Sequence, residues 1–212
     1  MFTAGRDAVQ AGLVKSLAKP GGRLTGIQTR SGDLIPKRLE ILKEMIPKAR
    51  RFLSFYGPDL SVGVARTSAR EAARRLRIDL VERHVRSADE LRESLRGLKA
   101  GEVDAIFLLP NIWAIIHGQL IVSTAIAKKL PTMFSERTSV AEGGLASYGT
   151  SYHEAGRLSA KYVHRVLLGA NPADLPIERL DRFELVINLK TAKAIGLTIP
   201  QSVLGRADEV IQ

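Results

Sequence analysis

The fold is decided by the run Ala105-Ile106-Phe107-Leu108-Leu109, in which no residue is polar. A continuous apolar run of this length, rich in branched and aromatic side chains, is typical of a strand that is buried on both faces of a parallel sheet. A second short apolar stretch, Pro131-Thr132-Met133-Phe134, predicts another strand. We expect residues 112–130, which lie between them, to form a helix.

Strands and helices alternate outward from this run. We expect strands at 52–56, 79–85, 105–109 and 131–134, and helices at 36–45, 60–76, 87–98 and 112–130. The sequence Ser87-Ala88-Asp89-Glu90 is typical of a capped helix start. Such alternation requires a parallel sheet with helices on both faces, so the sequence predicts an α/β fold with doubly wound parallel sheets.

The two ends of the chain depart from this alternation. Val9, Leu13 and Leu17 are four residues apart, which predicts a short helix that Pro20 ends. After Phe134 we expect strands at 145–148 and 182–187, a long helix at 153–168 and a short one at 191–195.

Composition excludes several classes of protein. The 212 residues contain no cysteine, so disulfides, thiolate metal sites and a cysteine nucleophile are excluded. No apolar run reaches the roughly 20 residues that a membrane-spanning helix needs. The amino terminus has no charged segment followed by an apolar core, so we expect no signal peptide in this chain.

The motifs of enzymes are incomplete. Ser16-Leu17-Ala18-Lys19 matches the Ser-x-x-Lys element of penicillin-recognising enzymes, but the two accompanying elements are absent. No Gly-x-Gly-x-x-Gly or Walker A sequence follows a predicted strand, and the four histidines share no metal-ligand spacing. We therefore expect no enzymatic activity, no cofactor and no metal ion.

The formal net charge of +10 raises the question of an anionic partner. Arg66, Arg70, Arg74 and Arg77 fall at helical spacing and predict one basic stripe. Because the usual signatures of nucleic-acid recognition are missing, we expect no nucleic-acid partner. The stripe is interpreted as a solvated helix face, and attraction to an anionic membrane is its alternative.

Polar residues follow the predicted strands. A doubly wound sheet binds its ligand beyond the carboxyl ends of the strands. The candidate ligand-binding residues there are Asp7, Tyr56, Asn111, Ser135, Glu136 and Tyr148. This set suits a small polar or zwitterionic ligand with an apolar body. Since Asp and Asn also favour turns, an ordinary turn is the alternative for each position.

The carboxyl-terminal residues carry a family resemblance. The stretches concerned are Asn171-Pro172-Ala173-Asp174-Leu175-Pro176, Phe183-Glu184-Leu185-Val186-Ile187-Asn188-Leu189-Lys190-Thr191-Ala192-Lys193-Ala194 and Gly196-Leu197-Thr198-Ile199-Pro200. Pro20-Gly21-Gly22 and Gly143-Gly144-Leu145-Ala146-Ser147-Tyr148-Gly149 fit the same pattern. Over essentially its whole length the chain resembles the substrate-binding proteins of ABC transporters, in the family whose better-known members are tied to tryptophan and tyrosine uptake.

This resemblance implies a two-lobed fold of the type I periplasmic-binding-protein class, with an incomplete first lobe. Residues 1–28 and 150–178 would form the partial first lobe, and residues 29–149 and 179–212 the second. The protein would capture a small solute, with an aromatic amino acid as a candidate, and deliver it to an ABC permease in the membrane. Asp7 and Asn111 would face each other across the cleft. The location would be periplasmic or extracytoplasmic, or cytoplasmic if the chain begins where it does here.

Some positions depart from the family pattern. Its Gly-Asp-Pro-Val turn reads Arg6-Asp7-Ala8-Val9 here, and its Leu-Pro-Asp-Pro turn reads Leu109-Pro110-Asn111-Ile112, so the identity of the ligand stays open. Two full lobes need roughly 250 residues. We therefore expect exposed apolar surface on the incomplete lobe, and self-association through it. The alternatives are a ligand-sensing domain of a lactose-repressor-type regulator, a non-functional truncated paralogue, and an enzyme of doubly wound fold.

Overall fold

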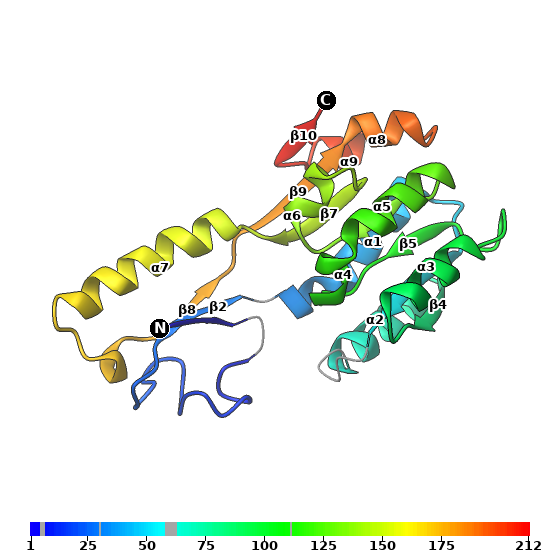
Figure 1. Cartoon of the computed structure of the whole chain (residues 1–212). Coiled ribbons are helices and arrows are strands. Elements are labelled where there is room, and N and C mark those ends of the chain that lie inside the picture. The colour runs from blue at the N-terminus through cyan, green and yellow to red at the C-terminus, as the bar shows by residue number, and fades with distance from the viewer. Residues whose placement is uncertain (5–6, 30, 58–62, 111) are drawn as a thin grey trace. The chain divides into compact units, whose positions relative to one another are not determined.

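The computed structural model describes residues 1–4, 7–29, 31–57, 63–110 and 112–212 (Figure 1). The chain divides into two compact units. Unit 1 comprises Met1–Asp33 and Thr150–Phe183, and unit 2 comprises Leu34–Gly149 and Glu184–Gln212. The chain crosses between the units after residues 33, 149 and 183. The lobe boundaries expected from the sequence lie after residues 28, 149 and 178, so the second agrees and the other two differ by five residues each.

Unit 2 is built on a seven-stranded sheet in the order β10-β9-β7-β6-β5-β3-β4. Five of its strands are parallel: β3 (Arg51–Tyr56), β4 (Asp79–His84), β5 (Ala105–Phe107), β6 (Thr132–Phe134) and β7 (Ala146–Thr150). β9 (Phe183–Asn188) and β10 (Glu209–Ile211) are parallel to each other. The Asn188 amide donates to the Leu145 carbonyl at 2.8 Å, which puts the end of β9 beside the start of β7. β9 and β10 therefore run against the other five strands.

Helices connect these strands. They are α1 (Ile35–Met45), α2 (Gly63–Arg75), α3 (Ala88–Arg96), α4 (Ile112–Ile116), α5 (Gly118–Ala127), α6 (Arg137–Ala141), α8 (Leu189–Ala194) and α9 (Gln201–Leu204). A 3-10 turn, Ser31–Leu34, leads into α1.

Both faces of the unit 2 sheet are buried, and the alternation of the central strands shows why. Phe52 and Phe107 pack on one face with α1, α2 and α8. Their chain neighbours Leu53 and Ile106 pack on the other face with α3 and α5. A strand that contacts helices on both sides favours apolar residues at successive positions, as in Ala105–Phe107. The prediction from the apolar run at 105–109 is confirmed.

Unit 1 is much smaller. Its sheet has the parallel order β1-β2-β8, formed by Phe2–Ala4, Gly26–Thr29 and Glu178–Leu180. The long helix α7 (Tyr152–Leu167) lies along this sheet (Figure 1), and a 3-10 turn, Pro172–Asp174, precedes β8. The core consists of two small clusters, one of Ile27, Ala155, Leu158 and Leu180, the other of Ala8, Val14 and Ile177.

The helix predicted from Val9, Leu13 and Leu17 is wrong, because residues 8–12 form turns instead. The Asp7 carboxylate accepts the backbone N–H groups of Val9 and Gln10, each at 2.9 Å. Gly12 then takes a left-handed conformation (φ 69°) that ends the turn. Val9 and Leu13 are exposed, so the apolar spacing reflects no buried helix face.

The helix predicted at 112–130 is interrupted at His117, which separates α4 from α5. The capped start of α3 is confirmed, since the Glu90 amide donates to the Ser87 hydroxyl at 3.1 Å. No helix in the described ranges is long and apolar enough to cross a membrane.

Candidate functional site

The carboxyl ends of the five parallel strands meet at one edge of unit 2. The register pairs Tyr56 with His84, Phe107 with Met133 and Phe134 with Ser147, so these strands finish side by side. We call the residues that close or follow them the carboxyl edge: 56–57, 84–87, 108–110, 135–136 and 148–149. Four sequence-predicted residues, Tyr56, Ser135, Glu136 and Tyr148, lie there. Their role in binding stays a prediction.

Ser135 and Glu136 follow the central strand β6 and are both buried, with 6% and 9% of their surface exposed. The Ser135 hydroxyl donates to the Glu136 carboxylate at 3.3 Å. A Cβ atom at Gly149 would lie 1.9 Å from the Ser135 carbonyl oxygen, so only glycine lets β7 pass this close to β6. The centre of the carboxyl edge thus combines closely packed backbone with a buried carboxylate.

Arg38 is a residue that sequence reasoning missed. Its side chain is completely buried on α1, and its Nε donates to the Tyr148 carbonyl oxygen at 2.5 Å. Arg38 shares the spacing i, i+4, i+7 with Leu42 and Met45, and this signal could have placed it on the buried face. The guanidinium therefore fixes β7 just before the chain leaves unit 2 at 149/150.

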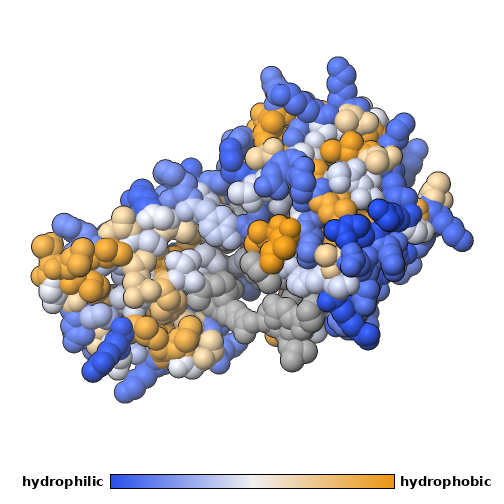
Figure 2. Space-filling view, viewed as in Figure 1, coloured by the Kyte–Doolittle hydropathy of each residue, from blue (hydrophilic) through white to orange (hydrophobic). Residues whose placement is uncertain are grey.

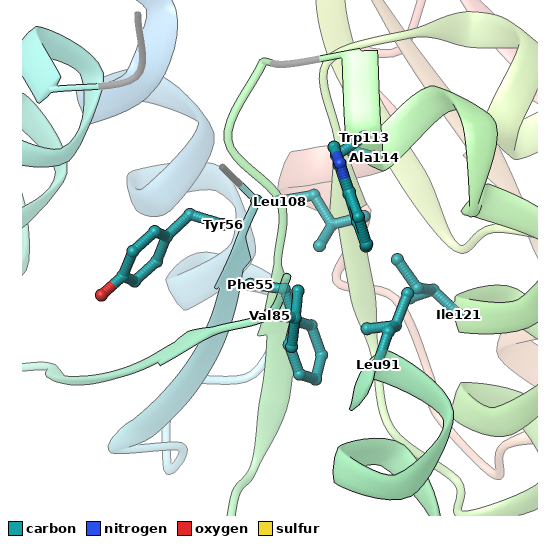
Figure 3. Close-up of a pocket in the computed structure, with 9 residues that line it drawn as sticks. Phe55, Tyr56, Val85, Leu91, Leu108, Trp113, Ala114 and Ile121 are labelled. Atoms are coloured by element: carbon teal, nitrogen blue, oxygen red, sulfur yellow. The ribbon is translucent and has the colours of Figure 1, made fainter. Parts of the chain in front are cut away.

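A group of apolar residues around the ends of β3, β4 and β5 is called the apolar wall (Figure 3). Phe55, Val85, Leu91 and Ile121 gather there, with the Trp113 ring next to Leu108. A Cβ atom at Gly57 would lie 2.6 Å from Cγ of Trp113, so the indole packs directly on the glycine. The free volume inside the wall is about 10 Å³, room for roughly one water-sized molecule. Phe55, Val85, Leu91, Leu108 and Ile121 are at most 5% exposed, so the wall is packed core with the partly exposed Trp113 at its margin, and it is not a preformed ligand cavity.

Tyr56 points away from this wall (Figure 3). Its ring stacks on His84 with 4.9 Å between centroids, and the Arg66 guanidinium lies 3.8 Å from the ring centre. The ring of Tyr56 thus packs against His84 and Arg66 of the same unit.

The four arginines predicted to form one basic stripe do not form a single solvated helix face, because two of them are paired and one lies beyond the helix. The Glu82 carboxylate accepts Nε of Arg66 at 2.8 Å and Nε of Arg70 at 2.6 Å. Burial raises the pKa of Glu82, but the hydrogen bonds and charges of the two arginines outweigh it and leave that pKa below its usual range. Arg77 follows the end of α2 in a left-handed conformation (φ 55°), so it does not continue the stripe.

Asp7 belongs to unit 1, where its carboxylate closes the turn before Gly12. The backbone hydrogen bond from Gln10 is the largest cause that holds the pKa of Asp7 below its ordinary value, and Gln28 and Arg179 act in the same direction. This structural role alone accounts for an acid at the position. Asn111 lies outside the described residues, and its expected pairing with Asp7 stays a prediction.

No three His, Asp or Glu side chains in the described part of the chain gather as a metal site would require.

Comparison with known proteins gives consistent matches. The family model for ABC transporter substrate binding proteins matches residues 1–211. A tyrosine-binding protein of Clostridioides difficile is 33% identical over 199 residues, which are 93% of this chain and 56% of that protein. The chain therefore spans little more than half the length of this curated relative.

Solved structures agree. An ABC domain from Streptococcus pneumonia in complex with L-Trp superposes with a TM-score of 0.83 at 30% identity, over 97% of this chain and 69% of that one. A conserved domain protein from Vibrio cholerae has a TM-score of 0.82 at 28% identity, over 96% and 68% of the two chains. The predicted periplasmic-binding-protein-like α/β fold is confirmed.

Proposed function

Because the chain belongs to the ABC transporter substrate-binding protein family, we propose that it acts as the solute-binding component of an importer. This is a family of binding proteins and not of enzymes. Unit 1 then corresponds to part of the first lobe and unit 2 to the second. The solute is captured extracytoplasmically and handed to an ABC permease in the membrane.

The carboxyl edge of unit 2 is the proposed binding surface. One observation carries this assignment: the buried carboxylate of Glu136 follows the central strand, where a doubly wound sheet holds its ligands. Tyr56, Ser135, Glu136 and Tyr148 supply polar groups at this edge, and the partly exposed Trp113 at the margin of the wall supplies apolar surface. Asp7 of unit 1 and Asn111 complete the proposed set.

An aromatic amino acid is the proposed class of solute. The pairing of a carboxylate with an apolar wall suits a ligand that carries an ammonium group and a flat apolar body. The names of two similar proteins support this class, since one is a tyrosine-binding protein and the other was solved with L-Trp.

Isothermal titration calorimetry with L-tryptophan and L-tyrosine tests the proposal, with L-leucine and D-tryptophan as competitors of the wrong shape or hand. Glu136→Gln should weaken binding by roughly 10-fold to 100-fold, because the ammonium group loses its charged partner in a buried place. Glu142→Gln is the matched control, since Glu142 is exposed at the end of the next helix.

Unchanged affinity in Glu136→Gln would contradict the assignment of the site. A folded chain that binds neither aromatic amino acid would contradict the solute class. Equal affinity for both hands of tryptophan would show that the site does not hold the ammonium group, carboxylate and ring in one fixed arrangement, and would contradict specific recognition of an amino acid.

A further inference from the structure

Positive side chains gather at the amino edge of the unit 2 sheet, the edge opposite to the carboxyl edge. The connections α1–β3, α2–β4, α3–β5 and α5–β6 all enter parallel strands there. We call their exposed lysines and arginines, together with those in the last helical turns before them, the basic pole. Its members are Lys48, Arg50, Arg74, Arg75, Arg77, Arg96, Lys99, Lys128 and Lys129.

Acidic residues near the basic pole pair mainly with other arginines. Glu44, Glu102 and Asp104 form ion pairs with Arg206, Arg83 and Arg51, none of which belongs to the pole. Among the described residues of these segments and strand starts, Glu93 and Asp79 are the acidic residues that remain, and the fifth connection, α6–β7, adds Glu142. The amino edge therefore carries a large excess of positive charge.

The carboxyl edge carries no such excess. Its described residues outside the strands hold one lysine or arginine, Arg86. The first helical turns beside it add Lys37, Arg38, Arg66 and Arg137, and Lys37, Arg66 and Arg137 are paired with carboxylates. The net positive charge of unit 2 is thus unevenly placed, with a concentration at one edge of the sheet.

Helix ends account for part of this pattern. Cations in the last turn of a helix are stabilised by the helix dipole, which explains Arg74, Arg75 and Arg96. The dipole effect fades within one turn, so it does not explain the lysines and arginines in the connections. Neighbouring parallel strands are about 4.8 Å apart, so the four connections form a row roughly 15 Å long.

We propose that the basic pole docks unit 2 on an anionic phospholipid bilayer. This inference rests on the proposed function, because a solute-binding component must meet its permease at the membrane. Each lysine or arginine near such a surface strengthens binding by about fivefold. A row of short connections presents its charges to a flat surface together. Docking through this edge leaves the carboxyl edge of the same sheet open to solute.

Nucleic acid fits the basic pole less well. The four connections and the last helical turns before them contain no aromatic residue that could stack on a base. They form a row of turns and offer no helix or ribbon that would enter a major groove.

The test compares two variants of the whole chain with equal loss of charge. The pole variant is Lys48→Gln, Arg75→Gln, Arg77→Gln, Lys99→Gln and Lys129→Gln. The control variant removes five exposed cations of unit 1: Lys15→Gln, Lys19→Gln, Arg23→Gln, Lys161→Gln and Arg165→Gln. Circular dichroism and thermal unfolding first establish that both variants are folded.

Binding is then measured to vesicles of mixed phosphatidylcholine and phosphatidylglycerol and to vesicles of phosphatidylcholine alone. We expect the parent and the control to bind the anionic vesicles, with an affinity that falls as salt is added. The pole variant should bind at least about 100-fold more weakly. Equal weakening of both variants, or equal binding of the parent to both kinds of vesicle, would overturn the proposal.

Duplex DNA serves as the competing probe. Tighter binding of the parent to DNA than to anionic vesicles, lost in the pole variant, would assign the pole to nucleic acid instead. Calorimetry with L-tryptophan on the pole variant separates this question from the proposed function. The pole variant should still bind L-tryptophan. Loss of vesicle binding therefore bears on the basic pole alone, and loss of solute binding bears on the proposed function.

Discussion

At the scale of single residues, Gly57 decides where the single tryptophan lies. A methyl group at this position would meet Cγ and Cδ1 of Trp113 at 2.6 Å, so Gly57→Ala must displace the indole. We expect a loss of about 1–3 kcal/mol in unfolding free energy, as for other overpacked sites, and a shift in tryptophan emission. Denaturant unfolding followed by fluorescence measures both.

Gly156→Ala is the control for this change. Gly156 lies inside α7, and an added Cβ atom would meet no neighbouring atom. The substitution should therefore stabilise the protein by about 0.5–1 kcal/mol, because alanine favours a helix over glycine. Equal effects of the two substitutions would contradict the packing of Trp113 on Gly57.

Arg38 and its neighbour Lys37 make a second contrast between adjacent residues. Arg38→Met takes the charged donor of the completely buried Arg38 side chain away from the Tyr148 carbonyl, and we expect a cost of about 1–3 kcal/mol in unfolding free energy. Lys37 is exposed and pairs with Glu40, so Lys37→Met should cost less than about 0.5 kcal/mol. Urea unfolding of both variants measures the two losses in unfolding free energy. Similar losses would contradict a stabilising role for the hydrogen bond from Arg38 to Tyr148.

At the scale of elements, Glu82 joins α2 to β4 through Arg66 and Arg70. Its pKa is lowered in the folded state, so the stability it contributes is fully present above the ordinary glutamate pKa of about 4.3. That contribution disappears as the pH falls through the lowered folded value. Glu82→Gln should therefore cost about 1 kcal/mol or less at neutral pH and almost nothing in strong acid. The measurement is unfolding free energy against pH, with Glu71→Gln, an exposed residue of α2, as the control. A cost that does not change with pH would contradict the role of the carboxylate.

The central strands and their helices could be predicted because burial on both faces leaves a strong pattern. Residues 105–109 are all apolar, and the structure places them between two cores. Short elements carry too few residues for a period to appear, so β2, β8, β10, α6 and α9 were missed. The helix expected at the amino terminus was wrong because three apolar residues at helical spacing can also lie in exposed turns. The left-handed conformation of Gly12 ends the turn there and excludes a continuous helix.

The candidate site was predictable only in part. The rule that ligands lie beyond strand ends located Tyr56, Ser135, Glu136 and Tyr148 at one edge. It says nothing about helix residues that reach the edge from outside the sheet, so Arg38 and Trp113 were missed. It also cannot tell which cations are paired, because the partner of Arg66 and Arg70 lies on another element.

At the scale of the whole molecule, unit 1 combines a small core with exposed apolar surface. Val163, Leu167 and Leu168, near the end of α7, are 46%, 80% and 75% exposed, and Figure 2 shows hydrophobic surface there. We expect the chain to self-associate through this surface, because contiguous exposed apolar groups favour association in water. Leu167→Gln with Leu168→Gln should weaken the association by about 10-fold or more in sedimentation velocity experiments.

The control for this surface is the pair Ile115→Gln and Ile116→Gln on α4, whose residues are 49% and 65% exposed. It removes comparable apolar area from unit 2. Equal loss of association in both variants would point to general stickiness and not to α7. A parent chain that remains monomeric at high concentration would contradict the expectation itself.

Hydrogen–deuterium exchange with and without L-tryptophan tests the central claim, that this chain binds solute at the carboxyl edge, most directly. Our account predicts that L-tryptophan slows exchange at the carboxyl edge, at Gly57, Leu108 and Glu136 after β3, β5 and β6 and at Gly149 near the end of β7. The helix-to-strand connections of the basic pole should exchange at the same rate in both samples. The account would be contradicted if L-tryptophan slowed exchange at the connections and left the rate at the carboxyl edge unchanged. It would also be contradicted if L-tryptophan changed the exchange rate nowhere in the chain.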